Sequence, residues 1–147
     1  KHVRSFWIVV DAVKVGFVRI HDLVGDDSPL FDLRILNGYQ RRGIGTSVVQ
    51  WLVAFLFDHY RRIGRIEATT QEDNVAMRTV LEKCGFVKEA QYRYSGRPGA
   101  MKSVETFGYS ILRRDWASGE VTVLAWKKQR SMGSVRRNRS LQVSLAA

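Results

Sequence analysis

The feature that most constrains the fold is an alternating strand pattern that runs into a glycine-rich loop and then into a helical pattern. Apolar residues recur at every second position from Phe31 to Ile35, which predicts a strand. The loop is NGYQRRGIGT, and residues 46–62 have helical apolar spacing, with Thr46 or a neighbour expected as the N-cap. These three segments together predict an anion site, because the first N–H groups of a helix lack partners and lie at the positive end of its dipole.

The loop nevertheless leaves three interpretations open: an ordinary turn, a nucleic-acid contact, or a cradle for a phosphorylated cofactor. Gly38 and Gly43 have the spacing of a P-loop, but Ile44 and Gly45 stand where Lys followed by Ser or Thr is required. A dinucleotide fingerprint that began at Gly43 would need a glycine at Val48. Neither nucleotide hydrolysis nor hydride transfer is therefore indicated.

The remaining segments predict an α/β fold with a mixed sheet. A β-branched and aromatic composition predicts strands, and apolar residues at helical spacing predict a second helix that begins at Asn74 and ends before Gly85. The expected elements are a hairpin over residues 5–23, a strand at 65–70, the helix at 74–84, and strands at 87–94 and 103–112. The motif RRDW at 113–116 is expected to end the compact region, and residues 121–126 could add a strand.

The composition narrows the class of protein. The chain has 147 residues, of which 45% are apolar, enough for one globular domain. The longest apolar stretch, residues 51–57, is too short to span a bilayer, and no signal peptide pattern is visible. A single cysteine, Cys84, excludes an internal disulfide and favours a reducing compartment, so we expect a cytoplasmic protein. The three histidines lack ligand spacing, so we expect no metal.

The net charge of +10 is unevenly distributed. Residues 120–147 contain six Lys or Arg and a single Glu, which accounts for half of the excess. We therefore expect a compact domain over residues 1–119 and a basic extension over residues 120–147. Because a strong positive charge attracts polyanions, a nucleic-acid-binding or ribosome-binding basic protein is the alternative function from another class. No groove-reading or RNA-binding motif accompanies the charge, so this alternative ranks second.

Two motifs together resemble the GNAT superfamily of N-acetyltransferases. The first is Gln40-Arg41-Arg42-Gly43-Ile44-Gly45, which fits the pattern Q/R-x-x-G-x-G/A, and the second runs from Asn74 through AMRTVLEKC to Gly85-Phe86. The resemblance covers residues 5–116 and is greatest to the branch of the ribosomal-protein-alanine and spermidine acetyltransferases. It implies a mixed, mostly antiparallel sheet flanked by helices. The strand and two helices that precede the first hairpin in the family have no counterpart in this sequence.

The resemblance implies acetyl-CoA as cosubstrate and direct transfer of its acetyl group to an amine. Pantetheine would pair with the strand end, pyrophosphate would meet the loop, Asn74 would lie near the pantetheine arm, and two basic residues would contact phosphate from outside. The implied cofactor-binding residues are Ile35, Leu36, Asn37, Gln40, Arg41, Arg42, Gly43, Ile44, Gly45, Thr46, Asn74, Arg78 and Lys83.

The implied reaction also needs a base for the ammonium proton and a donor for the developing oxyanion. We expect Asp32 as the first candidate base and Glu67 as the second, with a backbone N–H near Leu36 as the donor. The family often has a tyrosine, a proton donor to the thiolate, where this chain has Leu81. A degenerate member that binds CoA without catalysis is therefore a further alternative. The expected acceptor is a protein N-terminus or a small amine, and a homodimer is left open.

Overall fold

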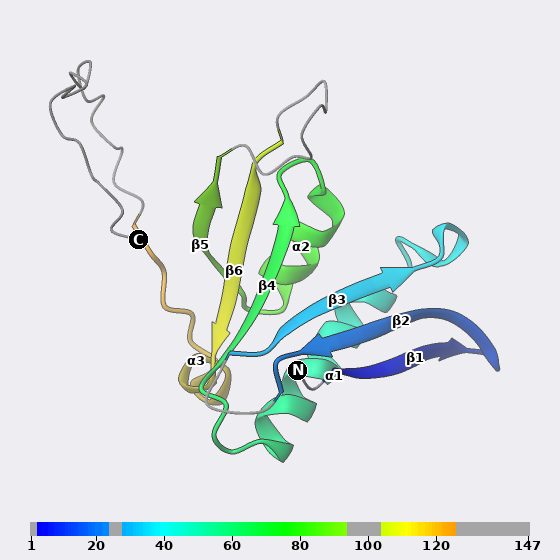
Figure 1. Ribbon diagram of the computed structural model, residues 1–147, viewed down its shortest axis with the longest axis horizontal. Coiled ribbons are helices and arrows are strands. Elements are labelled where there is room, and N and C mark those ends of the chain that lie inside the picture. The colour runs from blue at the N-terminus through cyan, green and yellow to red at the C-terminus, as the bar shows by residue number, and fades with distance from the viewer. Residues whose placement is uncertain (1–2, 24–27, 94–103, 126–147) are drawn as a thin grey trace, which may run out of the picture.

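The computed structural model describes residues 3–23, 28–93 and 104–125, and it contains one six-stranded sheet (Figure 1). The strand order is β1-β2-β3-β4-β6-β5, and every neighbouring pair is antiparallel except β3 and β4, which are parallel. The predicted class, a mixed and mostly antiparallel sheet with helices, is confirmed. The strands are β1 (Arg4–Val10), β2 (Val13–His21), β3 (Leu30–Ile35), β4 (Arg65–Gln71), β5 (Val87–Tyr92) and β6 (Thr106–Leu112).

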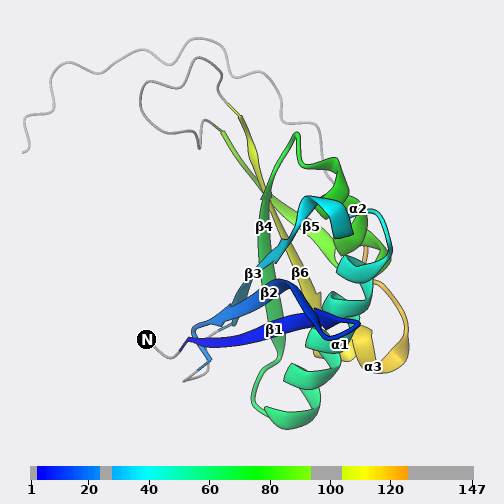
Figure 2. The same ribbon diagram turned by 90° about the vertical axis from the view of Figure 1, so that its right-hand side faces the viewer.

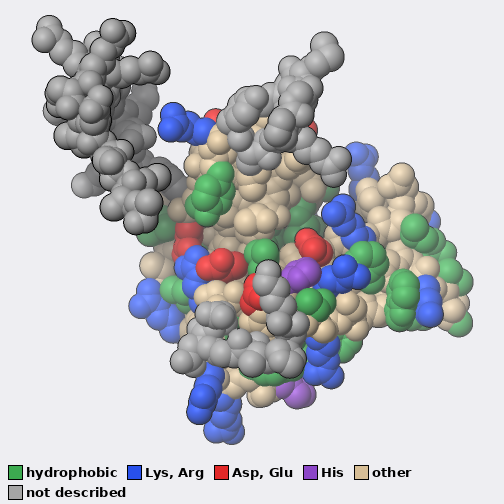
Figure 3. Space-filling model, in the orientation of Figure 1, with side chains coloured by type: hydrophobic (Ala, Val, Ile, Leu, Met, Phe, Trp, Pro, Cys, Tyr) green, Lys and Arg blue, Asp and Glu red, His purple; other side chains and the backbone are tan. Residues whose placement is uncertain are grey.

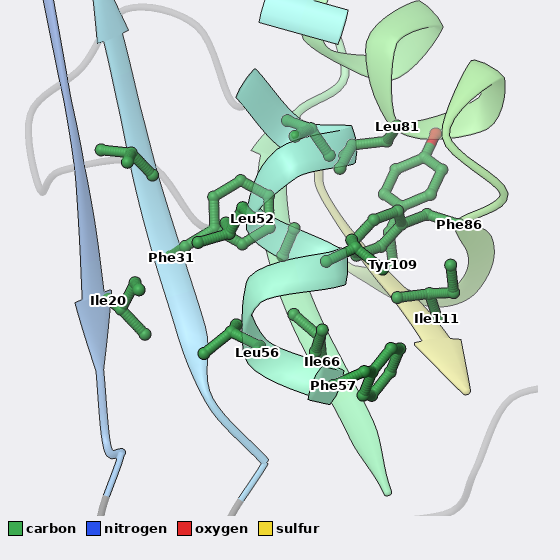
Figure 4. Close-up of a cluster of buried hydrophobic side chains, with 14 of the residues drawn as sticks. Ile20, Phe31, Leu52, Leu56, Phe57, Ile66, Leu81, Phe86, Tyr109 and Ile111 are labelled. Carbon is green, nitrogen blue, oxygen red and sulfur yellow. The ribbon is translucent and has the colours of Figure 1, made fainter. Parts of the chain in front are cut away.

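The helices lie on one side of this sheet, and no described helix covers the other side (Figure 2). They are the short 3-10 helix η1 (Asn37–Tyr39), α1 (Ile44–His59), α2 (Val75–Lys83) and α3 (Arg113–Ser118). The buried stripe of α1 consists of Val49, Leu52, Val53, Leu56 and Phe57. It packs against alternate strand residues such as Phe31 and Ile66, and the side chains of α2 complete the cluster at Leu81 (Figure 4). Burial of this stripe stabilises both the helix and the sheet.

The start of α1 differs from the prediction. Thr46 is not the cap: the N-cap is Gly43, whose φ is 77° and which has no side chain to accept a hydrogen bond. The left-handed conformation of Gly43 turns the chain into the helix three residues earlier than a side-chain cap at Thr46 would. Consequently the first turn of α1 has no side-chain oxygen on its N–H groups.

The start of α2 agrees with the prediction. The Asn74 side-chain oxygen accepts the backbone N–H of Met77 at 3.1 Å, as an N-cap residue does. At the other end, Gly85 has a φ of 86°, and the Phe86 N–H returns to the Leu81 carbonyl at 3.0 Å. Local chemistry therefore defines both ends of this helix.

The segment after β6 also differs. It contains a helix that was not expected: residues 113–118 form α3, which is closed by Gly119 with a φ of 73°. Residues 121–125 form no strand, and the last residue of that expected strand lies outside the described residues, as does the end of the strand expected at 87–94. The backbone N–H and the hydroxyl of Thr122 both donate to the Asp115 carboxylate, which attaches this segment to α3.

Candidate functional site

The two parallel strands of the sheet separate almost as soon as they meet. Leu30 and Glu67 are the single register pair between β3 and β4, and the Glu67 N–H donates to the Pro29 carbonyl at 2.9 Å. Beyond this point the two strands diverge toward their carboxyl ends (Figure 1). The divergence leaves a length of strand edge on each side without a neighbouring strand.

The direction of the backbone groups on β3 follows from one bond. The Leu36 N–H donates to the Val15 carbonyl on β2 at 2.9 Å. Since successive residues direct their backbone groups to opposite edges, the N–H groups of Leu33 and Ile35 point toward the opening, and by the same alternation so does that of Thr69 on β4. Of the backbone N–H groups near Leu36, that of Leu36 itself is already bonded within the sheet, whereas that of Ile35 faces the opening.

The opening leads into a groove of about 620 Å³ between β3, the loop, the first turn of α1 and one face of α2. Its floor is apolar and its rim is polar and basic, and its lining comes from two stretches that are distant in the sequence, residues 33–46 and 74–83. The lining residues are Leu33, Ile35, Tyr39, Gln40, Arg41, Gly43, Gly45, Thr46, Asn74, Val75, Ala76, Met77, Thr79, Val80 and Lys83.

The loop presents its backbone to this groove in an unusual conformation. Arg41 has a φ of 60° and Gly43 a φ of 77°, so two left-handed residues stand one residue apart. A left-handed arginine costs of the order of 1–2 kcal/mol, and such strain is concentrated at functional sites. The first bond of α1 joins the Ser47 N–H to the Gly43 carbonyl at 3.0 Å, so the N–H groups of residues 44–46 have no partner inside the helix.

Side chains brace the loop from within. The Gln40 side-chain amide donates to the Ile35 carbonyl at 3.0 Å and to the Asn37 side-chain oxygen at 3.2 Å. The Arg42 guanidinium lies 5.0 Å from the centre of the Tyr39 ring, which lines the groove. Gln40 and Arg42 therefore hold the loop in shape, while Arg41 lies at the rim.

The two basic residues of α2 have different surroundings. Lys83 lines the groove. Arg78 faces β6 instead: its guanidinium lies 5.0 Å from the centre of the Phe107 ring and donates to the Glu72 carbonyl at 2.9 Å. Arg78 is thus occupied in packing α2 on the sheet and is not a groove-lining residue.

The structure brings together eight of the cofactor-binding residues expected from the sequence. Those in the groove are Ile35, Gln40, Arg41, Gly43, Gly45, Thr46, Asn74 and Lys83. Those that do not line it are Leu36, Asn37, Arg42, Ile44 and Arg78. Sequence reasoning missed Leu33 and Tyr39, although Leu33 shares the period-two pattern with Ile35 and could have been found that way. It also missed five residues on the groove face of α2, namely Val75, Ala76, Met77, Thr79 and Val80.

The two candidate bases lie in different settings. The Asp32 carboxylate is 56% exposed, and its Oδ2 lies 3.1 Å from His21 Nε2 on β2. The Glu67 carboxylate is held by Arg65 at 2.7 Å, and the same guanidinium contacts Glu89 at 2.6 Å. Burial lowers the pKa of Arg65, but the hydrogen bonds and charges of the two glutamates outweigh it and raise that pKa. Glu67 therefore has the surroundings of a structural ion pair.

Cys84 adjoins the groove without facing an activating group. Its thiol lies 3.6 Å from the Thr46 carbonyl, and burial raises the pKa of the Cys84 thiol. A raised pKa keeps the sulfur protonated and a poor nucleophile. Among the described residues no cluster of His, Cys, Asp and Glu is arranged to hold a metal ion. None of the described helices has the length and apolar character needed to cross a membrane.

Comparisons with known proteins agree with this architecture. A family model for the acetyltransferase (GNAT) domain matches residues 1–87. No curated protein matches the chain. Among solved structures, a probable acetyltransferase is 22% identical with a TM-score of 0.68, over 78% of this chain and 64% of that one. A GNAT family acetyltransferase from Bacillus anthracis is 21% identical with a TM-score of 0.65, over 75% of this chain and 66% of that one.

A spermidine/spermine N-acetyltransferase from Vibrio cholerae is 17% identical with a TM-score of 0.71, over 80% of this chain and 69% of that one. At these identities the structural matches show a common fold. The chain spans less than two thirds of the length of the first two of these structures. The family model, in contrast, covers more than half of the present chain and includes the strand, loop and helix that form the groove. The chain therefore belongs to the GNAT family of acetyltransferases.

Proposed function

We propose that this protein binds acetyl-CoA in the groove and transfers the acetyl group directly to a primary amine. The observation that carries the proposal is the open edge of β3, which leads without interruption to the uncapped first turn of α1. The chemical needs of the cosubstrate match this arrangement. A diphosphate needs donors and positive charge, and a pantetheine arm has amides that pair with a free strand edge.

The proposed diphosphate position is the first turn of α1. The N–H groups of residues 44–46 are available there, and the helix dipole contributes roughly half a positive charge. Gly43 and Gly45 lack the Cβ atoms that would keep an anion away from the backbone. Arg41 and Lys83 add two cationic side chains at the rim of the same groove. This donor set suits a phosphate anion.

The proposed pantetheine position is the open edge of β3. The N–H groups of Leu33 and Ile35 are directed toward it, and Met77 and Val80 supply an apolar wall on the side of α2. The Asn74 amide nitrogen can donate from the start of α2, because its oxygen is the one used for capping. The N–H groups of Leu33 and Ile35 replace that of Leu36 as candidate donors for the oxyanion.

Bound acetyl-CoA would supply an activated thioester, so the protein has to position an amine, remove its proton and exclude water. Asp32 lies on β3 but on the face away from the helices, since Phe31, Leu33 and Ile35 direct their side chains toward them. An amine could approach from that face, which none of the described helices covers, while the cosubstrate lies in the groove. Of the two candidates we retain Asp32 for a part in removing the proton, because Glu67 is engaged by Arg65.

The acceptor is proposed only as a class, a protein N-terminus or a small amine. The similarity in fold to a spermidine/spermine N-acetyltransferase makes a polyamine worth testing. The alternative of CoA binding without catalysis is favoured by one observation: Leu81, at the position of the tyrosine found in many relatives, is fully buried and has no proton to give. The nucleic-acid alternative depends on a basic segment of which residues 126–147 lie outside the described residues.

Calorimetry with CoA and acetyl-CoA, followed by a thiol-release assay, tests the proposal. We expect a Kd in the micromolar range for CoA and release of thiol when a suitable amine is added. A Kd weaker than about 1 mM would remove the proposed groove function altogether. Binding without release over a panel of amines would select the non-catalytic alternative.

A further inference from the structure

We infer that His21 and Asp32 act as one proton-accepting pair on the face of the sheet opposite the groove, with the His21 imidazole taking the proton and the Asp32 carboxylate orienting it. This inference rests on the proposed function, and it assigns the removal of the ammonium proton to two side chains instead of one. It makes His21 the catalytic base and Asp32 the positioning residue.

The geometry of two neighbouring strands carries the inference. In the antiparallel register His21 is opposite Leu30 and Arg19 is opposite Asp32, so the histidine and the aspartate are diagonal neighbours on β2 and β3. Their side chains share the uncovered face, and Nε2 lies 3.1 Å from Oδ2. Figure 3, which views this face, shows a histidine beside acidic side chains near its middle.

The position of the pair suits a substrate-facing role. His21 is opposite the residue at which β3 and β4 meet, and Asp32 lies two residues further, where the strands have begun to part. The two side chains are 31% and 56% exposed, so an amine can reach them from solvent. If the pantetheine arm follows the open edge of β3 as proposed, the thioester carbon at its end reaches the opening between the same two strands.

The proposed chemistry follows from the hydrogen-bond donor and acceptor of the imidazole ring. A neutral histidine has one N–H and one lone pair. If Nε2 donates its hydrogen to the Asp32 carboxylate, the lone pair is on Nδ1, and the carboxylate stabilises the imidazolium that forms when Nδ1 takes a proton. An aspartate acting alone would have to accept the ammonium proton itself, although a carboxylate is a much weaker base than an imidazole.

The protons and electrons balance over one turnover. The ammonium gives one proton to Nδ1 of His21, which passes it to solvent. The nitrogen lone pair then forms the new C–N bond as the C–S bond breaks, and the electron pair of that bond stays on sulfur. The second proton of the nitrogen ends on the thiol. The net products are an amide, free CoA and one proton in solution.

Two of the other charged groups on this face, Arg19 and Glu67, have different partners. Arg19, opposite Asp32, donates from Nε to the Ser5 hydroxyl at 3.3 Å. Arg34 follows on the same face of β3, and on β4 the Glu67 carboxylate is bound by Arg65. In the part of the chain that the structure describes, His21 is the one ion-pair partner of Asp32. The two arginines favour the ionised carboxylate and oppose the imidazolium, so the pair needs its direct hydrogen bond.

The test compares His21→Gln, Asp32→Asn and the double variant with the wild type. His59→Gln is the matched control, because His59 is exposed at the end of α1 and is remote from the pair in the sequence. The acceptors are spermidine, a short peptide that begins with alanine, and an aminoglycoside. CoA affinity is measured by calorimetry, and thiol release is measured between about pH 5 and pH 9.

We expect each single variant to lower kcat by about 100-fold with unchanged CoA affinity, and the double variant to lose little more than either one. The acidic limb of kcat/KM should disappear in His21→Gln and stay unchanged in His59→Gln. A merely structural role for His21 would not move that limb.

Wild-type turnover in His21→Gln together with a loss in Asp32→Asn would overturn the pair and leave the proposed function intact. A wild-type kcat/KM that does not fall on lowering the pH to about 5 would do the same, because it would indicate a base weaker than an imidazole. If the wild type binds CoA but releases no thiol with any of the three acceptors, the inference is overturned as well. Failure to bind CoA at all would instead remove the proposed function itself.

Discussion

Gly45 in the first turn of α1 lies so close to Val80 of α2 that a Cβ atom on the glycine would be 3.5 Å from a Val80 methyl group. The same Cβ would lie 3.6 Å from the end of the Ile35 side chain and 3.9 Å from that of Leu33. All of these residues line the groove. The two helices and β3 therefore meet at Gly45, and the size of this residue sets the depth of the groove.

The first prediction is that Gly45→Val weakens CoA binding by about 10- to 100-fold, which corresponds to roughly 1.4–2.8 kcal/mol. The two extra methyl groups would have to enter the groove, since the Cβ itself already reaches van der Waals contact. Gly45→Ala adds only that Cβ, so we expect an affinity within about threefold of wild type and a helix more stable by about 0.5–1 kcal/mol. Calorimetry with CoA measures the first effect and urea unfolding the second.

The control for this series is Gly64→Val. Gly64 is an exposed residue before β4, and a Cβ on it meets nothing within 4 Å. We expect no change in CoA affinity there. Equal affinity of the wild type and Gly45→Val would contradict the proposed position of the diphosphate and pantetheine.

The second prediction separates two roles of Asn74. Asn74→Ala removes the oxygen that caps α2 and should cost about 1 kcal/mol of stability. Asn74→Ser keeps a capping oxygen but lacks the amide N–H that we propose as a donor to the pantetheine arm. If both roles are real, both variants lose CoA affinity by severalfold while only Asn74→Ala loses stability. Wild-type CoA affinity in Asn74→Ser would reduce Asn74 to a cap.

Sequence reasoning succeeded where the chemistry is local. The period-two pattern of Phe31, Leu33 and Ile35 predicted β3, and its inward face is confirmed by burial. The cap at Asn74 and the left-handed residue at Gly85 were also foreseeable, because each depends on a few neighbouring residues. These local signals were sufficient for the order of the elements and for the glycine loop.

Sequence reasoning failed where the position of a side chain or backbone group depends on contacts between segments that are distant in the sequence. Nothing in the pattern of α2 tells which of its two basic residues faces the groove, since Arg78 is fixed by a ring on β6 and Lys83 is not. The bond from Leu36 to Val15, which decides which of the N–H groups near Leu36 face the opening, depends on the register of β2 and β3. The proximity of His21 to Asp32 also depends on the register of β2 and β3, and no motif spacing in the sequence predicts it.

The third prediction concerns Arg113, which joins β6 to the end of α1. Its guanidinium donates to the carbonyls of Phe57, Tyr60 and Ile63 at 2.7, 2.7 and 2.8 Å. A cation at the carboxyl end of a helix also interacts favourably with the negative end of the helix dipole. We expect Arg113→Met to lower the free energy of unfolding by about 2–4 kcal/mol, because three partly buried carbonyls lose a charged donor.

Arg113→Lys should recover only part of this loss, since one ammonium cannot reproduce the fork of the guanidinium. Arg62→Met is the matched control, because Arg62 is exposed and close in sequence to these carbonyls; its effect should stay within about 0.5 kcal/mol. Urea unfolding followed by circular dichroism measures all three. A loss in Arg113→Met no greater than in Arg62→Met would show that the three bonds contribute nothing net.

The fourth prediction is a dependence of stability on pH that arises at Asp115. The backbone N–H of Thr122 donates to the carboxylate at 3.1 Å and the Thr122 hydroxyl donates to it at 3.0 Å. The pKa of Asp115 is lowered, chiefly by the backbone hydrogen bond from Thr122. Burial acts in the opposite direction and raises this pKa, but the hydroxyl bond and the charge of Arg114 lower it further. A carboxyl whose pKa is lower in the folded state stabilises the fold at pH values above its ordinary pKa of about 4, and this contribution is lost as the pH falls through the lowered value.

Asp115→Asn should therefore be less stable than the wild type at pH 7, and the difference should shrink as the pH is lowered from about 5 to about 3. Thr122→Val removes the hydroxyl but keeps the backbone donor, so it should show the same trend with a smaller difference at pH 7. Urea unfolding midpoints at pH 7, 5 and 3 for the three proteins are the measurement. If the gap between wild type and Asp115→Asn is independent of pH, the ionised carboxylate is not what attaches residues 120–125 to α3, and the shape of Asp115 alone accounts for the contact.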